Sequence, residues 1–377
     1  MKAFSKCFLA LFVLCVILLP ACQKEITQAN DESADLTNKS MSSSKLAHRI
    51  IVHAGSSIQA AVNTAEAGFI IQIDPGVYKE AIVVNTPGIQ LIGSGKGVII
   101  QNPGDEENGI TVNDNGDGFV LKNVTVQNFK ENGIVLTSVD NFTISRVTAI
   151  NNGEYGIFPV HSSHGVIEFC MVKGHSDTGI YVGQSSDVKM EFNAAFENVN
   201  GLEVENSSNV SVTHNESFNN VCGILIDLLP GKDIKTSSNI YVGNNKVISN
   251  NHVNFGTPGS LESVVPKGLG ILVLGADQTT VENNIVIGND FAGITVFSTL
   301  VLGSLAGIPP AAFADIDPNP DNAKIIGNFV RKNGSAPPSL AIPLPGVDFL
   351  WDGSGANNCW KNNIYDSSYP SPLPTCN

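Results

Sequence analysis

The sequence has few aromatic residues, few basic residues and few apolar runs long enough to form a helix. Aromatic side chains make up 7% of the 377 residues, whereas glycine occurs 36 times. This composition is typical of a protein built from short strands and turns. Since a solenoid builds its core coil by coil, the hydrophobic content of 42% requires no globular centre.

Basic residues are outnumbered, and the motifs of several enzyme classes are missing. The chain has 21 Lys and Arg against 35 Asp and Glu, and without Lys2 and Lys6 the balance is 19 against 35, a net charge of −16. Nucleic acid is therefore not an expected partner, because its phosphates recruit basic residues. No Cys or His spacing resembles a zinc site, and no Gly-x-Ser-x-Gly, phosphate loop or dinucleotide fingerprint occurs.

The sequence does contain a phrase that returns at a fixed period, a glycine followed by an aliphatic residue and a short strand. Its glycines are Gly109, Gly133, Gly156, Gly179, Gly201 and Gly223, and then Gly270 and Gly293. The steps in the first group are 24, 23, 23, 22 and 22 residues, and the last pair is 23 apart. A period in this range indicates stacked supersecondary units.

The kind of unit follows from what one period contains. Each period holds two or three short β-branched runs separated by Asn, Ser, Asp and Gly, and none is long enough for a helix. Strands joined by tight turns, without a crossover helix, can lie parallel only if the chain itself coils. The predicted fold class is all-β, a single-stranded parallel β-helix.

A column of asparagines supports the same register. The position just after the middle strand of each coil holds Val124, Val147, Cys170, and then Asn193, Asn215, Asn245, Asn284, Asn328 and Asn362. An inward Asn in successive coils can donate and accept amide hydrogen bonds above and below. The alternative is that Asn is simply common in turns, but six aligned copies favour a ladder.

The first residues have the features of an export signal. Lys2 and Lys6 precede an apolar run from Phe8 to Leu19, which is too short to span a bilayer. The run ends in Leu19-Pro20-Ala21-Cys22, which resembles a bacterial lipoprotein signal, so residues 1–21 are expected to be removed and Cys22 lipidated. The alternative is an ordinary cleaved signal peptide with an incidental cysteine.

The anchor predicts a location in the bacterial cell envelope. Residues 22–47 contain almost no large apolar side chain and are expected to form a lipidated, flexible tether. The protein would then be held by lipid at the outer membrane or cell surface, with the periplasmic side as an alternative. In such a compartment Cys359 and Cys376 could form a disulfide that fixes the last coil. Cys170 and Cys222 are interpreted as small buried residues.

The chain between residues 48 and 100 resembles the opening of a known fold family. Residues 56–62 have an N-terminal serine and apolar residues at helical spacing, which predicts a short capping helix. Asp74-Pro75-Gly76-Val77-Tyr78-Lys79-Glu80 and Leu91-Ile92-Gly93-Ser94-Gly95 follow. Together they resemble pectin-lyase-like right-handed β-helix proteins, which include pectin esterases, polysaccharide lyases, glycosidases and uronate epimerases. The resemblance implies a right-handed β-helix over residues 48–377.

A second resemblance covers about residues 150 to 300. Phrases such as Tyr155-Gly-Ile-Phe-Pro-Val, Asn198-Val-Asn-Gly-Leu-Glu-Val and Gly223-Ile-Leu-Ile-Asp are similar to a family of exported bacterial proteins with parallel β-helix (PbH1) repeats. No reaction is assigned to that family, so the resemblance implies export and handedness but leaves the chemistry open.

Two insertions interrupt the period, near residues 228–268 and 300–345. Loops of this kind mark the working face of a solenoid. We call them insertion 1 and insertion 2. The second is apolar and rich in proline, and packing on the helix wall is favoured over contact with a partner protein.

The candidate site lies on the outward side of the repeated strand, where alternate residues point away from the core. Outward positions in consecutive coils are Phe158, Tyr181, Glu203 and Leu225, and two residues further along Val160, Gly183, Glu205 and Asp227. Since neighbouring coils lie ~4.8 Å apart, Glu203, Glu205 and Asp227 should share one patch. Such carboxylates repel one another unless a cation binds or one stays protonated, so they are candidates for acid–base catalysis on glycosides or for calcium binding. A solvated acidic face is the alternative.

Other residues near this patch suit a carbohydrate. Phe158 and Tyr181 offer flat apolar surface to a sugar ring, and His161, Asp177 and His252 are further candidate contacts, although each singly is more often structural. His161 ends Tyr155-Gly-Ile-Phe-Pro-Val-His161, which resembles the Tyr-Gly-x-Asp-Pro-His site of mannuronan epimerases but has Phe158 and Val160 in place of Asp and His. That mechanism is therefore not carried over. The patch has no clustered Arg or Lys, so a polyanionic substrate is not expected there without calcium.

The leading hypothesis is an exported, lipid-anchored β-helix that binds a polysaccharide and processes it if the carboxylates are catalytic. An enzyme of this kind would be a polysaccharide-active hydrolase or lyase, with acid and base supplied by Glu203, Glu205 or Asp227 and the sugar oriented by Tyr181 or His161. The alternative from a different class is a non-catalytic envelope scaffold that binds a protein through its two insertions.

Overall fold

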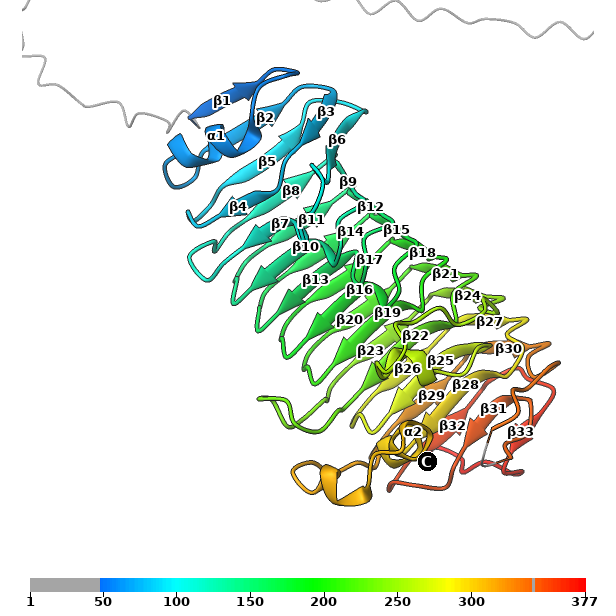
Figure 1. Ribbon diagram of the computed structural model, residues 1–377. Helices are drawn as coiled ribbons and strands as arrows, with labels where there is room; N and C mark the ends of the chain where they lie inside the picture. Colours follow the sequence, from blue (N-terminus) through cyan, green and yellow to red (C-terminus); the bar gives the residue numbers. More distant parts are fainter. Residues whose placement is uncertain (1–47, 341–342) are drawn as a thin grey trace, which may run out of the picture. The chain divides into compact units, whose positions relative to one another are not determined.

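In the computed structural model, which describes residues 48–340 and 343–377, the chain coils into three long parallel sheets (Figure 1). We call them sheets A, B and C. One coil runs through a strand of A, a strand of B and a strand of C before the chain returns to A one layer further along. The predicted all-β parallel β-helix is confirmed. The signal, Cys22 and the tether lie outside the described residues.

From β2 to β32 the strands follow one another in rotation through the three sheets. Sheet A comprises β1 (Arg49–Val52), β2 (Ile70–Ile73), β5 (Gln90–Gly93), β8 (Val120–Lys122), β11 (Thr143–Ser145), β14 (Val166–Glu168), β17 (Lys189–Glu191), β20 (Ser211–Thr213), β23 (Tyr241–Gly243), β26 (Thr280–Glu282), β29 (Lys324–Ile326) and β32 (Cys359–Lys361). Sheet B comprises β3 (Gly76–Lys79), β6 (Val98–Gln101), β9 (Thr125–Gln127), β12 (Thr148–Ile150), β15 (Met171–Lys173), β18 (Ala194–Phe196), β21 (Glu216–Phe218), β24 (Lys246–Ile248), β27 (Ile285–Ile287) and β30 (Phe329–Arg331).

Sheet C has the longest strands and the face on which the candidate site was expected. It comprises β4 (Ile82–Val84), β7 (Asn108–Val112), β10 (Asn132–Thr137), β13 (Ile157–Val160), β16 (Thr178–Gly183), β19 (Asn200–Glu205), β22 (Cys222–Asp227), β25 (Leu269–Leu274), β28 (Ala292–Phe297), β31 (Val347–Trp351) and β33 (Ser368–Tyr369). The described helices are α1 (Ile58–Thr64), α2 (Thr299–Ala306) and the 3-10 turns η1 (Glu262–Val264) and η2 (Pro310–Phe313).

The core is a stack of aliphatic columns, one residue per coil. In sheet A the middle residues Leu121, Ile144, Ile167 and Met190 lie directly above one another and are completely buried. Full burial of such a side chain contributes about 1.5–3 kcal/mol. Because the period of a strand is two, this column fixes which residues point outward.

The predicted asparagine ladder is present, with one correction. Each Asn donates its side-chain amide to the Oδ1 of the next at 2.9–3.0 Å, through Asn193, Asn215, Asn245, Asn284 and Asn328. The last rung is Asn363, at 3.0 Å from Asn328, and not Asn362. Asn362 takes the left-handed turn conformation that precedes each rung, with φ of 56°. The prediction was one residue short in the last coil.

A second ladder was missed in the sequence. It joins the turns between sheets B and C through Asn152, His175, Asn198, Asn220, Asn250, Asn289 and Asn333. His175 stands in a position that Asn occupies in the other coils, which hides the repeat in a simple comparison of residues. Two parallel ladders therefore satisfy the buried turn amides on both sides of sheet B.

The ends of the described chain are closed in different ways. Helix α1 lies over the first coil, as Figure 1 shows, with Ser57 as its N-cap and Ile58, Ala61 and Val62 buried against the strands. At the other end a disulfide joins Cys359 to Cys376. Among the helices of the described residues, none is long and apolar enough to cross a membrane.

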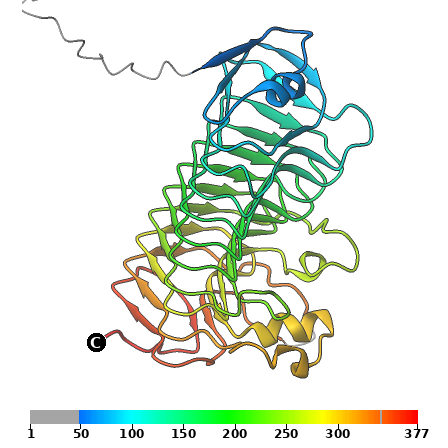
Figure 2. The ribbon, with the colours of Figure 1, turned by 90° about the vertical axis from the view of Figure 1, so that its left-hand side faces the viewer.

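Each insertion consists of two excursions within a single coil. Insertion 1 leaves the coil between β22 and β23 and again between β24 and β25, and insertion 2 does so between β28 and β29 and between β30 and β31. Figure 2 shows the excursions on one side of the solenoid, with α2 among them. Gly231 N–H and Lys235 Nζ of insertion 1 both contact Asp315 Oδ2 of insertion 2, at 3.1 and 2.5 Å.

Candidate functional site

The structure aligns the candidate residues in the predicted register. Tyr181 pairs with Glu203, and Glu203 with Leu225, while Gly183, Glu205 and Asp227 form the next column. One oxygen from each of Glu203, Glu205 and Asp227 lies within 4.8 Å of the others. We call these three residues the acid cluster.

The acid cluster is covered, whereas the sequence predicted an open outward groove. Glu203, Glu205 and Asp227 are only 3%, 4% and 1% exposed. Insertion 1 folds back over this part of sheet C, because its apolar residue Val265 packs with Leu225 in a second hydrophobic cluster outside the coil. A repeat period fixes the strands but carries no information on the path of an insertion, which is why the cover was not predicted.

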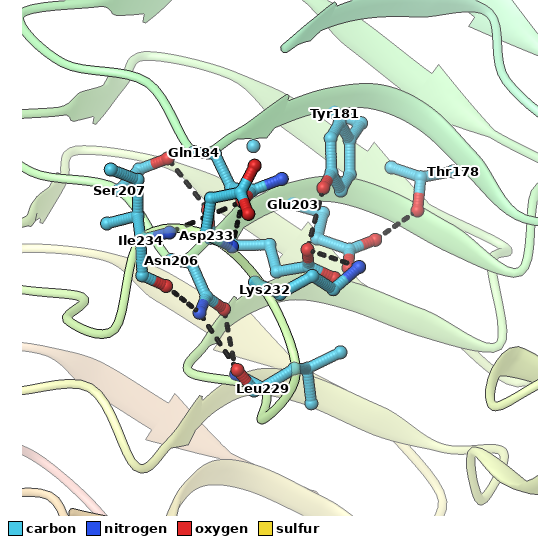
Figure 3. Close-up of polar contacts among 12 residues, drawn as sticks. Thr178, Tyr181, Gln184, Glu203, Asn206, Ser207, Leu229, Lys232, Asp233 and Ile234 are labelled. Atoms are coloured by element: carbon cyan, nitrogen blue, oxygen red, sulfur yellow. Dashed lines mark hydrogen bonds and ion pairs between the residues drawn. The ribbon is translucent and has the colours of Figure 1, made fainter. Parts of the chain in front are cut away.

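Each glutamate of the acid cluster has its own set of partners (Figure 3). Glu203 Oε2 accepts hydrogen bonds from the Thr178 hydroxyl and, at 3.1 Å, from the Asn200 amide. Glu205 Oε1 accepts the Tyr181 hydroxyl at 2.8 Å and lies 2.9 Å from Lys232 Nζ of insertion 1. Lys232 is therefore the counter-charge supplied by the covering loop.

Within the acid cluster, Asp227 has the fewest hydrogen-bond partners for its carboxylate. Its Oδ1 is buried and has no hydrogen-bond partner among the described residues, and the same holds for Oδ1 of Asn200. Burial, and then the Glu205 carboxylate nearby, raise the pKa of Asp227 well above its usual value. Burial, and then Asp227, do the same to the pKa of Glu203. Both shifts favour the protonated forms of Asp227 and Glu203, and protonation is one of the two ways in which crowded carboxylates avoid repulsion.

The first excursion of insertion 1 is held down by side chains of the coils beneath it. Asn206 donates to the carbonyls of Leu229 and Ile234 at 2.9 and 2.7 Å and accepts the Leu229 N–H at 2.8 Å (Figure 3). Gln184 Oε1 accepts the Asp233 N–H at 2.7 Å. These contacts fix the backbone that positions Lys232.

Three aromatic rings adjoin the acid cluster on the side where the cover ends. Tyr155 and Phe158 have ring centroids 4.4 Å apart, and Phe158 stacks on Tyr181 at 4.7 Å with an interplanar angle of 24°. Tyr155 and Phe158 are half-buried, whereas Tyr181 is buried. We call these three residues the aromatic step, since they mark the passage from open sheet to covered sheet.

Comparison with known proteins agrees with the architecture. Residues 81–228 match the family model described as "Right handed beta helix region". The described domain is a right-handed parallel β-helix. It shares this pectin-lyase-like fold with the A-module of mannuronan C-5 epimerase AlgE4 from Azotobacter vinelandii, at 17% identity and a TM-score of 0.58, over 83% of this chain and 93% of that one. No curated protein matches the sequence.

A second solved structure gives the same result for the β-helix. The enzymatically active domain of tailspike protein 2 from bacteriophage CBA120 is 14% identical with a TM-score of 0.55. The match covers 80% of this chain and 44% of that one. At such identities the likeness shows the fold, and the site has to be judged on its own residues.

The remaining predicted residues of the β-helix are distributed over several environments. Asp177 is buried, with its Oδ1 3.0 Å from the Thr178 hydroxyl, and burial followed by Glu262 raises its pKa well above the usual value. His161 is exposed, and its Nε2 lies 3.7 Å from Asp233 of insertion 1. His252 packs edge-on against Phe255 within insertion 1, and this contact lies inside the loop.

Several residues of the site were not predicted. Thr178 and Asn200 begin the repeated strands and were interpreted only as part of the repeat, although a polar residue directly before the glycine in these two coils was the available signal. Lys232 gave no such signal, because it lies in an insertion outside the period.

The acid cluster can be tested against the requirements of calcium. Carboxylates and the free Oδ1 atoms of Asp227 and Asn200 are suitable hard ligands. With Lys232 Nζ at 2.9 Å from Glu205, however, a cation already occupies this environment. The residues therefore suit calcium only when the Lys232 ammonium is absent. Calcium binding at the acid cluster stays a proposal, limited to a protein in which Lys232 is displaced or replaced.

Proposed function

We propose that the protein binds a carbohydrate chain on the outer face of sheet C, where a sugar ring stacks on the accessible parts of Tyr155 and Phe158 and the buried Tyr181 supports them. The observation that carries this proposal is the grouping of Tyr155, Phe158 and Tyr181 within 5.2 Å of one another at the edge of the covered region. Aromatic faces that end an open sheet surface are suited to the apolar faces of sugars. The fold is also that of a mannuronan C-5 epimerase module, which favours a polysaccharide over other ligands.

Binding is the activity that this conformation supports, and a reaction would require an additional step. Glu203, Glu205 and Asp227 are covered by insertion 1, so none of them reaches a bound sugar while Lys232 holds the loop in place. A hydrolase or lyase reaction at the acid cluster would depend on movement of that loop. We therefore propose the acid cluster as a site that opening of insertion 1 would expose.

The test of carbohydrate binding uses Phe158→Ala, screened on an array of neutral and acidic polysaccharides. The affinity for the polysaccharide that wild type prefers is expected to fall by up to about tenfold, because one stacked aromatic ring contributes about 0.5–1.5 kcal/mol. The matched control is Phe218→Ala, which removes a partly exposed ring from sheet B. Absence of any glycan bound by wild type, or equal affinity of Phe158→Ala and wild type, would contradict the proposal.

A second candidate function is docking of a protein through insertion 2. The residues from Phe291 to Ala314 carry no charge, and Pro309, Pro310, Ala311 and Ala312 are exposed on the outer surface. Substitution of Ala311 and Ala312 by Lys leaves the aromatic step intact. Loss of a partner from these variants, with glycan binding unchanged, would favour the docking function over the carbohydrate site.

We also propose that the β-helix is attached to the bacterial envelope through a lipid on Cys22. The support is the arrangement of Lys2 and Lys6, a short apolar run and Leu19-Pro20-Ala21-Cys22 at its end. Mass spectrometry of the mature N-terminus is expected to find acylated Cys22, and Cys22→Ser is expected to release the protein from the membrane fraction. An unmodified Cys22 would contradict the anchor.

A further inference from the structure

The turn between sheets A and B changes in width at one place on the β-helix. Between β8 and β9 it consists of Asn123 and Val124, and between β11 and β12 of Arg146 and Val147. One coil earlier, between β5 and β6, it consists of residues 94–97, Ser-Gly-Lys-Gly. The wider turn projects beyond the narrower ones, so a step in the surface forms below it.

A hollow of about 510 Å³ lies at this step. Its upper wall is the loop from Gly93 to Val98, and its floor and lower wall come from the next two coils through Asn123, Thr125, Arg146 and Thr148. The volume is large compared with a water molecule and suits a sugar-sized ligand. The hollow lies at the turn from sheet A to sheet B and shares no residue with the acid cluster or the aromatic step.

The two charged residues that line the hollow are both cations. Lys96 and Arg146 lie in different coils, and neither is within ion-pair distance of a carboxylate anywhere in residues 48–340 or 343–377. The whole chain carries 35 acidic residues against 21 basic ones. Two unpaired cations in one concave place are therefore a local reversal of the protein's charge.

Arg146 is held in position without a direct carboxylate partner in the described chain, although the Ser145 hydroxyl beside it donates to Glu168 Oε1 at 2.9 Å. The Arg146 guanidinium lies 5.0 Å from the centre of the Phe169 ring, and its Nη1 is 3.3 Å from the Ser145 hydroxyl. A guanidinium has five N–H donors, so most remain available to a ligand. A planar cation fixed in this way is well suited to an oxyanion, which it can bind through two parallel hydrogen bonds.

The other lining groups are donors and acceptors of the kind that sugars use. Thr125 and Thr148 are outward neighbours on β9 and β12 and are half-buried, so their hydroxyls stand side by side. The N–H groups of Gly95, Lys96 and Gly97 make no hydrogen bond to another part of the described chain. The glycine-rich loop is followed by strand β6 and not by a helix, so it differs from a nucleotide-binding phosphate loop.

We propose that this hollow binds a sugar unit that carries an oxyanion, such as a sulfate, phosphate or carboxylate group. Lys96 and Arg146 contact the oxyanion, and Thr125, Thr148 and the backbone of the wide turn contact the sugar hydroxyls. This site is independent of the aromatic step. It gives the β-helix a second ligand contact on another face. This second site prefers an anionic sugar, whereas a polyanion is not expected at the acid cluster.

Titration calorimetry with dextran and dextran sulfate tests the proposal on the mature protein. The wild type is expected to bind dextran sulfate and to bind dextran at least about tenfold more weakly, since charge-assisted hydrogen bonds dominate such contacts. Non-specific attraction of a polyanion is not expected, because the protein itself is strongly acidic. Polygalacturonate, inorganic sulfate and inorganic phosphate serve as further probes.

The decisive variant is the double substitution Lys96→Gln/Arg146→Gln. It is expected to lose the preference for dextran sulfate. The matched control is Lys189→Gln/Lys361→Gln, which removes the same charge from exposed positions and should bind as wild type does. Since Arg146 also packs on Phe169, the single variant Lys96→Gln is measured alongside and should show a partial loss with an unchanged melting temperature.

Each outcome bears on the proposal. Binding of polygalacturonate with the same sensitivity identifies a carboxylate as the oxyanion, whereas binding of the free ions without binding of dextran sulfate overturns the assignment of a sugar unit. Equal affinity for dextran and dextran sulfate, or wild-type affinity in the double variant, overturns the proposal. An equal loss in the control variant overturns it as well, because the effect would then come from total charge.

Discussion

At the scale of single residues, His175 is the exception within a ladder of asparagines. Its Nδ1 lies 2.8 Å from Asn198 Oδ1 and acts as the donor, while its Nε2 accepts from the Asn152 amide at 3.3 Å. The neutral imidazole thus makes the same pair of hydrogen bonds as an asparagine. Burial lowers its pKa to about 4, because a charged ring would lose both its water and its acceptor role.

This environment predicts a loss of stability in mild acid. Below a pKa of about 6.5 the unfolded chain takes up a proton that the folded chain takes up only below about 4, so the free energy of unfolding falls between these values by up to about 3 kcal/mol. His175→Asn continues the ladder without a titrating group. Urea unfolding from pH 7 to pH 4 should show a smaller decrease for the variant. Parallel curves for variant and wild type would contradict the assignment.

For Glu203 we expect the opposite dependence of stability on pH. Its pKa is raised, so its contribution to stability is present below the unfolded pKa of about 4.5 and is lost as pH rises toward the folded value. Glu203→Gln keeps an oxygen for Thr178 and Asn200 and removes the titration. At pH 8 the variant should be more stable than wild type, and at pH 4 the two should be equal.

Thermal unfolding at these two pH values is the measurement for Glu203. Glu107→Gln, at an exposed position, is the matched control and should change little at either pH. A Glu203→Gln variant that is less stable than wild type at pH 8 would mean that the carboxyl is ionised and favourably paired in the folded protein.

Single residues also show what the sequence could and could not reveal. The alternation along each strand was sufficient to place Tyr181, Glu203 and Glu205 on one outward face, and the structure has them there. The ladder position of His175 was not recognised, because the hydrogen-bonding role that it shares with Asn depends on geometry and not on residue type. The prediction that the acid cluster is exposed to solvent was wrong. The alternation along a strand indicates which side a residue faces, but it does not indicate what covers that side.

At the scale of elements, the coils are fixed by repetition and the insertions by individual contacts. The strands follow a period, so their pairing could be derived from a few glycines. The first excursion of insertion 1 instead depends on Asn206, Gln184 and the ion pair between Lys232 and Glu205. Such contacts have no periodicity, and they involve residues 23 to 50 positions apart.

The ion pair makes Lys232 the residue that controls access of a second cation to the acid cluster. Burial opposes the charge of Lys232, but Glu205 outweighs it, and the pKa of Lys232 is raised overall. Lys232→Met is expected to reduce the free energy of unfolding by about 1–3 kcal/mol, a range that allows for its partial exposure. The same change should let calcium bind.

Thermal unfolding with and without calcium tests this role of Lys232. Saturating calcium should raise the melting temperature of Lys232→Met, and a concentration of 100 times Kd corresponds to about 2.7 kcal/mol. Wild type should respond much less. Lys235→Met, which removes a lysine of the same loop that contacts Asp315, is the matched control. Equal effects of calcium on all three proteins would rule out a site at the acid cluster.

At the scale of the whole described domain, the β-helix is a stack in which each coil pairs only with the coils on either side. Interior coils are paired twice, but the first and last expose one row of backbone groups. The ends are therefore the parts most prone to local opening. Helix α1 covers the first coil, and Glu80 fastens it by accepting the Ile58 and Gln59 N–H groups at 2.7 and 3.1 Å and the Ser57 hydroxyl at 2.7 Å.

Glu80→Ala should therefore open the first coil without disturbing the middle of the stack. Three hydrogen bonds to the start of α1 are lost, which is expected to lower the local free energy of opening by about 1–2 kcal/mol. Hydrogen exchange should become faster in α1, β1 and β2 and stay unchanged in β16 and β19. Lys79→Ala, at the exposed neighbouring position, is the control. Faster exchange in all coils would mean that the domain opens as one cooperative unit, so that pairing between neighbouring coils does not limit how far a break at one end spreads.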